Sequence, residues 1–100
     1  KMEARMEDCK LQVEIKQYGQ TTSWTVPLDQ VDKDKMVPFL DDKYNPGFRL
    51  PARGNQTIIQ KKAGGSSAEV SQLELVFADK PNASKAIYSI IKMIDECQGK

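Results

Sequence analysis

Apolar and polar side chains alternate in two segments near the start of the chain, residues 10–18 and 21–28. The alternating apolar positions are Leu11, Val13, Ile15, Trp24, Val26 and Leu28. A period of two is typical of strands that bury one face. The segment Tyr18-Gly19-Gln20-Thr21 supplies turn residues between them, so the pattern predicts a β-hairpin. Pro27 lacks a backbone N–H, and we therefore expect the second strand to end there or to lie at a sheet edge.

The middle of the chain predicts short strands separated by turns. Residues 29–35 are charged and fit a connection or a short helical turn, and residues 36–40 fit an edge strand or an irregular plug because they include Pro38. Strands are expected at 48–50 and 57–62. Turn residues over 41–47, with Asn45-Pro46-Gly47 the strongest signal, and over 51–55 mark the intervening connections. We expect residues 48–50 and 57–61 to pair as a second hairpin.

The segment after these strands is rich in glycine and serine. Residues 63–68 read Ala-Gly-Gly-Ser-Ser-Ala, which predicts a mobile loop that is too long for a tight hairpin turn. Leu73, Leu75 and Phe77 then alternate with polar residues and predict a strand over 69–78. Because Val76 is apolar on the other face, we expect this strand to be central.

A helix is predicted from about Asn82 to Gln98. One apolar stripe recurs at helical spacing through Ala83, Ala86, Ile87, Ile90, Ile91, Ile94 and Cys97. Asn82 is the expected N-cap, with Asp79 as the other candidate. Burial of four isoleucines at roughly 1.5–3 kcal/mol each is ample to dock the helix on a sheet. Its stripe is therefore predicted to belong to the core.

These elements predict an α+β fold in which an antiparallel sheet of about five to six strands packs against one C-terminal amphipathic helix. A strand that runs directly into a closing helix, Leu73 to Phe77 and then Ala86 to Ile94, resembles the end of pleckstrin-homology-like and polo-box-like domains. The resemblance concerns architecture over about 30 residues and no family motif accompanies it. A ββββα nucleic-acid-binding sheet and a small phage or viral structural subunit fit the same pattern.

The length and composition fit one folded domain, which we place at residues 10–98. The chain has 100 residues, of which 39% are hydrophobic and 29% charged. Residues 1–9 are predicted to be an N-terminal tail or the end of a preceding helix. The first residue is not methionine, so we expect a fragment or a processed form. No apolar run approaches the roughly 20 residues of a membrane span.

The residue types argue against common catalytic and metal chemistry. The chain has no histidine, so the usual nucleophile–histidine triads are excluded, and two cysteines alone cannot complete a structural zinc site. No glycine-rich loop precedes a helix as phosphate-binding motifs require. We predict a non-enzymatic protein without cofactor or metal.

One segment is strongly basic although the net charge is only +1. Residues 43–68 contain five basic and no acidic residues, and the expected second hairpin would bring Arg49, Arg53, Lys61 and Lys62 to one end or face. Such groups bind phosphates, so an anion, nucleic-acid or phosphoinositide site is an alternative function. Few aromatic residues lie nearby, which argues against stacking on single-stranded nucleic acid.

The leading functional prediction is a non-catalytic interaction module that binds a protein partner through a strand edge or a loop surface. The candidate edge residues are Met36, Val37 and Phe39. Nucleic acid or anionic lipid is the other possible partner, and the pattern says nothing about oligomeric state. We expect an intracellular location. A secreted domain with a Cys9–Cys97 disulfide is the second alternative, since the sequons at Asn55 and Asn82 fit secretion.

Overall fold

The computed structural model describes residues 2–17 and 19–98, which form eight strands, three single-turn 3-10 helices and one α-helix. The strands are β1 (Met2–Glu7), β2 (Lys10–Gln17), β3 (Gln20–Pro27), β4 (Val37–Leu40), β5 (Pro46–Pro51), β6 (Ile59–Ala63), β7 (Ser66–Val70) and β8 (Gln72–Val76). The helices are η1 (Leu28–Gln30), η2 (Lys33–Lys35), η3 (Arg53–Asn55) and α1 (Lys80–Gln98).

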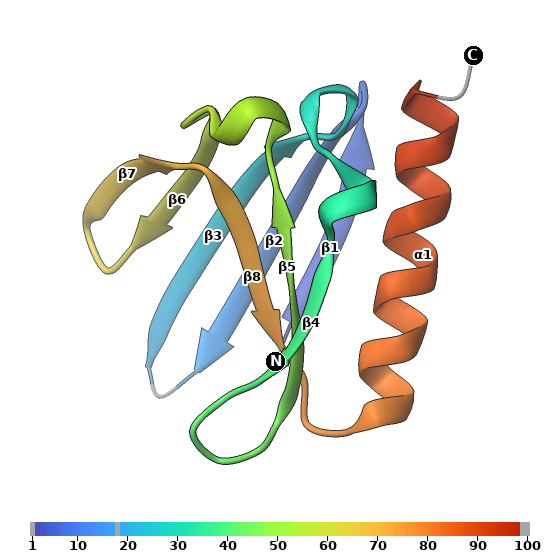
Figure 1. Ribbon diagram of the computed structural model, residues 1–100. Coiled ribbons are helices and arrows are strands. Elements are labelled where there is room, and N and C mark those ends of the chain that lie inside the picture. Colours follow the sequence, from blue (N-terminus) through green and yellow to red (C-terminus); the bar gives the residue numbers. More distant parts are fainter. Residues whose placement is uncertain (1, 18, 99–100) are drawn as a thin grey trace.

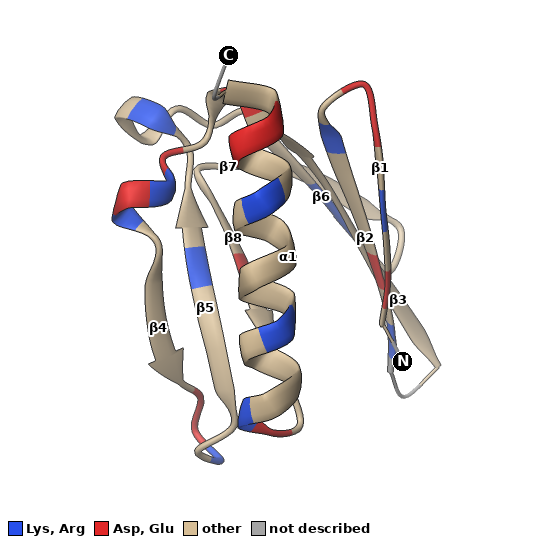
Figure 2. Cartoon of the chain, turned by 90° about the vertical axis from the view of Figure 1, so that its right-hand side faces the viewer, with Lys and Arg blue, Asp and Glu red and all other residues tan. Residues whose placement is uncertain are grey.

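The strands form two antiparallel sheets that face each other. The first sheet has the order β1-β2-β3-β6-β7, and the second has the order β4-β5-β8 (Figure 1). Helix α1 runs along one side, with the three-stranded sheet to its left and the five-stranded sheet to its right in Figure 2. It packs on β5 and on η1. The predicted α+β class with a closing C-terminal helix is confirmed, with more strands than expected and two sheets.

The core lies between the sheets and the helix. Fully buried side chains come from both sheets, from the segment 28–31 and from α1: Leu11, Val13, Val26, Leu28, Val31, Phe48, Leu50, Ile59, Leu73, Leu75 and Ile94. From the helix, Ala83 and Ile90 are also buried. Each large aliphatic side chain buried in this way stabilises the fold by roughly 1.5–3 kcal/mol. The prediction that the apolar stripe belongs to the core holds for most of it, since Ile87 and Cys97 also pack against the core. Ala86 and Ile91 are half-buried and lie outside the core cluster.

The helix begins two residues earlier than expected, because Asp79 is its N-cap. The Asp79 carboxylate accepts a hydrogen bond from the backbone N–H of Asn82, with an N–O distance of 2.9 Å, and a second from the Asn82 side chain. Asn82, the first candidate for this role, lies inside the first turn. A carboxylate is well suited to this position because it accepts a hydrogen bond from a free backbone N–H. Its negative charge also interacts favourably with the positive N-terminal end of the helix dipole.

The first predicted hairpin is confirmed, since β2 and β3 pair throughout their length. Pro27 is the last residue of β3, which matches its missing donor. Residues 29–35 contain the expected helical turns, and β4 is the predicted edge strand. The Asn45-Pro46-Gly47 turn lies slightly earlier, because β5 already begins at Pro46. Tyr18, expected in the first turn, lies outside the described residues.

Two segments differ from the prediction because of pairing. Residues 2–7, expected as a tail or a helix end, form strand β1 on β2. Residues 63–68 contain a tight hairpin turn instead of a mobile loop. Ala63 pairs with Ser66 across Gly64 and Gly65, whose φ angles are 58° and 136°. Glycine adopts such positive φ angles readily, so two residues suffice to reverse the chain.

The predicted arrangement of the later strands is wrong in two respects. Residues 48–50 and 57–61 do not pair, since β5 pairs with β4 and β8 in one sheet and β6 pairs with β3 and β7 in the other. The strand predicted over 69–78 is interrupted at Ser71, and its second part, β8, is an edge strand. The second face of this strand, which carries Val76, is therefore not covered by a core layer, and Val76 is 37% exposed.

Candidate protein-binding surface

The β4–β5 hairpin and the adjoining end of β8 expose most of the large apolar side chains that lie outside the core. Val37 is 50% exposed, Leu40 59%, Tyr44 80% and Val76 37%. Together with the half-buried Phe39 they form what we call the hairpin surface. Figure 2 shows that β4 carries no charged residue. Clustered apolar side chains in solvent are typical of interaction sites, whereas single ones are ordinary.

Strand register places part of the hairpin surface on the outer face of the three-stranded sheet. Phe39, Gly47 and Val76 lie directly opposite one another across β4, β5 and β8. The Phe39 ring covers Gly47: a Cβ at that position would lie 3.0 Å from Cζ of Phe39 and would also meet the Leu75 carbonyl. A side chain at residue 47 would therefore displace the ring, and glycine allows the aromatic group to lie flat on the sheet.

Arg49 contacts two side chains on the same outer face, Phe39 and Glu74. Its guanidinium lies 4.2 Å from the centroid of the Phe39 ring, and its Nε donates to a Glu74 carboxylate oxygen at 2.6 Å. Val37, Arg49 and Glu74 share the neighbouring register row. The cation–π contact and the ion pair hold Phe39 in place without burying it. The outer face is thus an ordered apolar surface beside one ion pair.

Backbone hydrogen bonding at the free edge of β4 is limited by proline. The N–H of Phe77 donates to the Pro46 carbonyl, so Pro46 directs its backbone towards β8. By strand alternation, Gly47 and Arg49 bond to Phe39 and Val37, which leaves Pro38 and Leu40 facing outwards. Pro38 has no N–H to donate, which is a common way to protect an edge strand. Pro38 therefore leaves β4 with fewer outward donors for the addition of a further strand.

The turn that supports this hairpin is organised by Asp41. Its carboxylate accepts hydrogen bonds from the backbone N–H groups of Asn45 and Lys43, both at 2.8 Å, and from the Asn45 side chain. The pKa of Asp41 is lowered, above all by the bond from the Asn45 backbone, because these donors favour the ionised form. Tyr44 has a φ of 63°, so it adopts the left-handed conformation within the turn.

The predicted edge residues occupy three different environments. Met36 packs against the core, Val37 is exposed, and Phe39 is half-buried under Arg49. Leu40 lies in the segment 36–40 that was expected as an edge strand but was not named as a binding residue, whereas Tyr44 and Val76 were missed. Leu40 precedes the turn predicted over residues 41–47 and Tyr44 lies within it, a position that usually lies at the exposed end of a hairpin. Val76 could not be recognised, because its exposure depends on the edge position of β8.

The four basic residues predicted as an anion site do not share one face. Arg49 lies on β5 with Glu74, whereas Arg53 lies in η3 and donates to the Gln98 side chain at 2.7 Å. Lys61 and Lys62 are successive residues of β6 and therefore point to opposite faces. The Lys61 ammonium lies 4.8 Å from the centroid of the Trp24 ring. Because the expected hairpin does not form, the basic residues are distributed over three elements.

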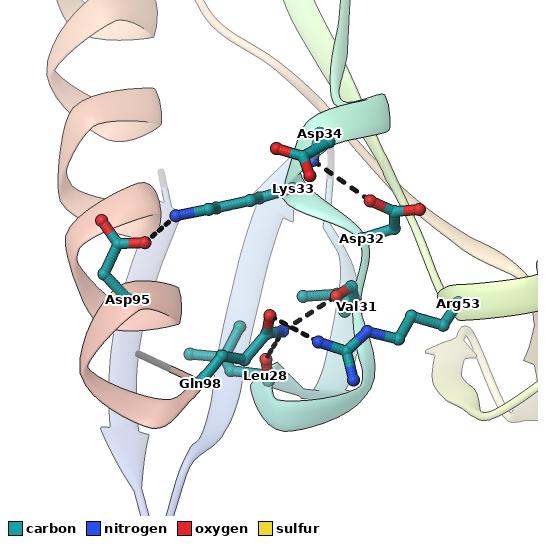
Figure 3. A network of polar contacts seen from close by, with 8 residues as sticks. All are labelled: Leu28, Val31, Asp32, Lys33, Asp34, Arg53, Asp95 and Gln98. Atoms are coloured by element: carbon teal, nitrogen blue, oxygen red, sulfur yellow. Dashed lines mark hydrogen bonds and ion pairs between the residues drawn. The ribbon is translucent and has the colours of Figure 1, made fainter. Parts of the chain in front are cut away.

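A network of contacts fixes the end of α1 to the turns that precede β4 (Figure 3). The Gln98 amide donates to the carbonyls of Leu28 at 2.7 Å and Val31 at 2.8 Å, and Lys33 forms an ion pair with Asp95. These carbonyls belong to the segment that leads into the hairpin. The helix thereby positions the base of β4.

The same end of α1 is attached covalently to the other sheet. Cys9, in the β1–β2 turn, forms a disulfide with Cys97, with the two Cα atoms 5.8 Å apart. The bridge joins residues separated by 88 positions. The pairing that the sequence left open is therefore present, and it connects the five-stranded sheet to the helix.

Comparison of the chain with protein-family models, with curated proteins and with solved structures found no match. Among the described residues, no group of three or more Cys, Asp and Glu side chains is arranged to hold a metal ion.

Proposed function

We propose that the protein is a non-catalytic interaction module whose hairpin surface binds an apolar surface of a protein partner. The observation that carries this proposal is the concentration of exposed apolar side chains at one place, Val37, Leu40, Tyr44 and Val76. The contact of Arg49 with the Phe39 ring and the hydrogen bonds of Asp41 in the turn restrict the motion of the hairpin before binding. Less conformational entropy is therefore lost when a partner binds. Because Phe39 and Leu40 are successive residues of β4, the hairpin presents apolar side chains on both faces.

A bait experiment tests this function. The full chain and the variant Val37→Ser/Leu40→Ser/Tyr44→Ser are immobilised in parallel, and proteins retained from an extract of the native source are quantified by mass spectrometry. We expect the bound partner to be lost with this variant. It should be retained with the matched control Tyr88→Ser, which alters an apolar residue that is 66% exposed on α1.

Salt and charge separate this proposal from anion binding. Apolar recognition persists at high ionic strength, whereas binding through surface charges is screened. Simultaneous charge reversal at Arg53, Lys61 and Lys62 should leave the partner bound, because these residues lie outside the hairpin surface. Loss of the partner in the charge-reversal variant would contradict the proposal. Loss of the partner from the unaltered chain at moderate salt would contradict it as well.

We further propose that the protein acts in an oxidising compartment and not inside the cytosol. The Cys9–Cys97 bridge supports this location, since structural disulfides persist in secreted proteins and are reduced in the cytosol. Asn55 of the first sequon is exposed in η3 and available for glycosylation. Alkylation of the native protein without reductant should add no mass, and addition of two alkyl groups would refute the proposal. No helix in the described part of the chain is long and apolar enough to cross a membrane.

A further inference from the structure

Strand β1 borders the five-stranded sheet and has β2 as its neighbour on one side only. Residues 3–7 of this strand are exposed, including Met6 at 37%. Charged residues of both signs follow one another along it (Figure 2). An exposed edge of six residues is a template for pairing with another strand unless some feature prevents it.

The backbone orientation of β1 follows from the turn that joins it to β2. Glu7 and Lys10 pair across the two-residue turn Asp8-Cys9, so they form the hydrogen-bonded pair that closes the hairpin. By alternation, Glu3 and Arg5 also bond to β2, whereas Met2, Ala4 and Met6 direct their N–H and C=O groups outwards. No proline interrupts this row of donors and acceptors.

The sequence of β1 is complementary to itself when read in the antiparallel direction about Ala4. In that register Ala4 lies opposite Ala4 of a second copy, and Met2 lies opposite Met6. Both are hydrogen-bonded pairs, because all three residues face outwards. Glu3 then lies opposite Arg5 in a non-hydrogen-bonded pair, the type in which side chains are closest. Charges on an edge strand usually oppose pairing, but here Glu3 and Arg5 each meet the opposite charge.

The apolar face of β1 provides a second reason for pairing. Ala4 and Met6 lie opposite Val13 and Leu11 on the face that forms the core. Val13 and Leu11 are 2% and 0% exposed, yet Ala4 and Met6 remain accessible. The apolar face therefore continues to the edge of the sheet, and a strand with the same Met–Ala–Met pattern would extend it.

From these features we propose that β1 pairs antiparallel with β1 of a second copy, which joins two five-stranded sheets in a two-fold symmetric dimer. The disulfide attaches the β1–β2 turn to α1 and so fixes the position of this end of β1. Asp8 and Cys9 have φ angles of 53° and 60°, a conformation that the two-residue turn requires. The opposite edge, β7, has only Glu69 as a charged residue and offers no matched pairs.

Charge exchange tests the register. Sedimentation equilibrium of the full chain over a concentration series should show a monomer–dimer equilibrium. Glu3→Arg and Arg5→Glu each place like charges opposite one another, and each should weaken self-association roughly 30-fold, as expected when two cross-strand pairs change from attraction to repulsion. A mixture of the two variants should form a heterodimer, because its pairs are again opposite in charge. Failure of the mixture to associate would overturn this register.

Proline substitution tests the backbone pairing. Ala4→Pro removes an outward N–H without touching the β1–β2 ladder, and it should abolish the dimer while circular dichroism shows a folded chain. The matched control Ser67→Pro changes the corresponding outward position of β7 and should leave the dimer intact. A wild-type chain that stays monomeric at high concentration, or a dimer lost only in Ser67→Pro, refutes the proposal. The Val37→Ser/Leu40→Ser/Tyr44→Ser variant should still dimerise, which separates this inference from the proposed function.

Discussion

Removal of the Cys9–Cys97 bridge should lower the free energy of unfolding by about 4–5 kcal/mol. The bridge closes a loop of 88 residues, and the chain-entropy estimate for that length gives about 4.6 kcal/mol at 25 °C. Most small domains have a total stability of roughly 5–15 kcal/mol, so this is a large share. The effect arises in the unfolded chain, whose ends are no longer held together. The folded helix keeps the contacts of Gln98 and Asp95.

Urea unfolding measures this effect, because the chain has one tryptophan and Trp24 is only 6% exposed in the core. Its fluorescence and the circular dichroism of α1 should report the same transition. Cys9→Ser, Cys97→Ser and the double variant each break the same bond, so their losses should agree within experimental error. A loss below about 1 kcal/mol would refute the entropic argument, which assigns the loss to loop closure. Unequal losses for the two single variants would show that one cysteine contributes mainly by packing.

Two further predictions concern the contacts that hold the hairpin in place. Gln98→Ala leaves two backbone carbonyls of the 28–31 segment without their donor and should cost about 1–3 kcal/mol of unfolding free energy, whereas the exposed control Glu96→Ala should stay within roughly 0.5 kcal/mol in urea titrations. Because the pKa of Asp41 is lowered on folding, its carboxylate stabilises the turn above its unfolded pKa, and this contribution is lost as the pH falls through the folded pKa. Asp41→Asn should therefore show a smaller loss of stability on acidification than the wild-type chain, and identical pH profiles would contradict this linkage.

Elements with a strong local pattern were predictable from the sequence. The β2–β3 hairpin follows from alternation around a turn, and α1 follows from a stripe of isoleucines at helical spacing. Both signals lie within one element and its immediate neighbours. The boundaries shifted by about two residues, as with Asp79 at the start of α1, because capping depends on which carboxylate reaches a free N–H.

The pairing of distant strands was not predictable in the same way. Met2 and Met6 are four residues apart, which fits a helix as well as a strand, and only pairing with β2 makes the segment a strand. The division of β5 and β6 between two sheets likewise depends on contacts far apart in the chain. The hairpin surface was therefore only partly identified: Val37 was expected, whereas the exposure of Val76 follows from the edge position of β8.

The two proposed surfaces are physically independent, and this has a consequence for binding. The hairpin surface belongs mainly to the three-stranded sheet, whereas β1 borders the five-stranded sheet. Pairing through β1 uses no residue of the hairpin surface, so a dimer would present two copies of it. A partner with two matching sites would then bind with an avidity above that of one contact, provided that both sites can be reached together. Arg5→Glu should weaken the binding of such a bivalent partner at protein concentrations near the dimer dissociation constant, while the binding of a monovalent partner should remain unchanged.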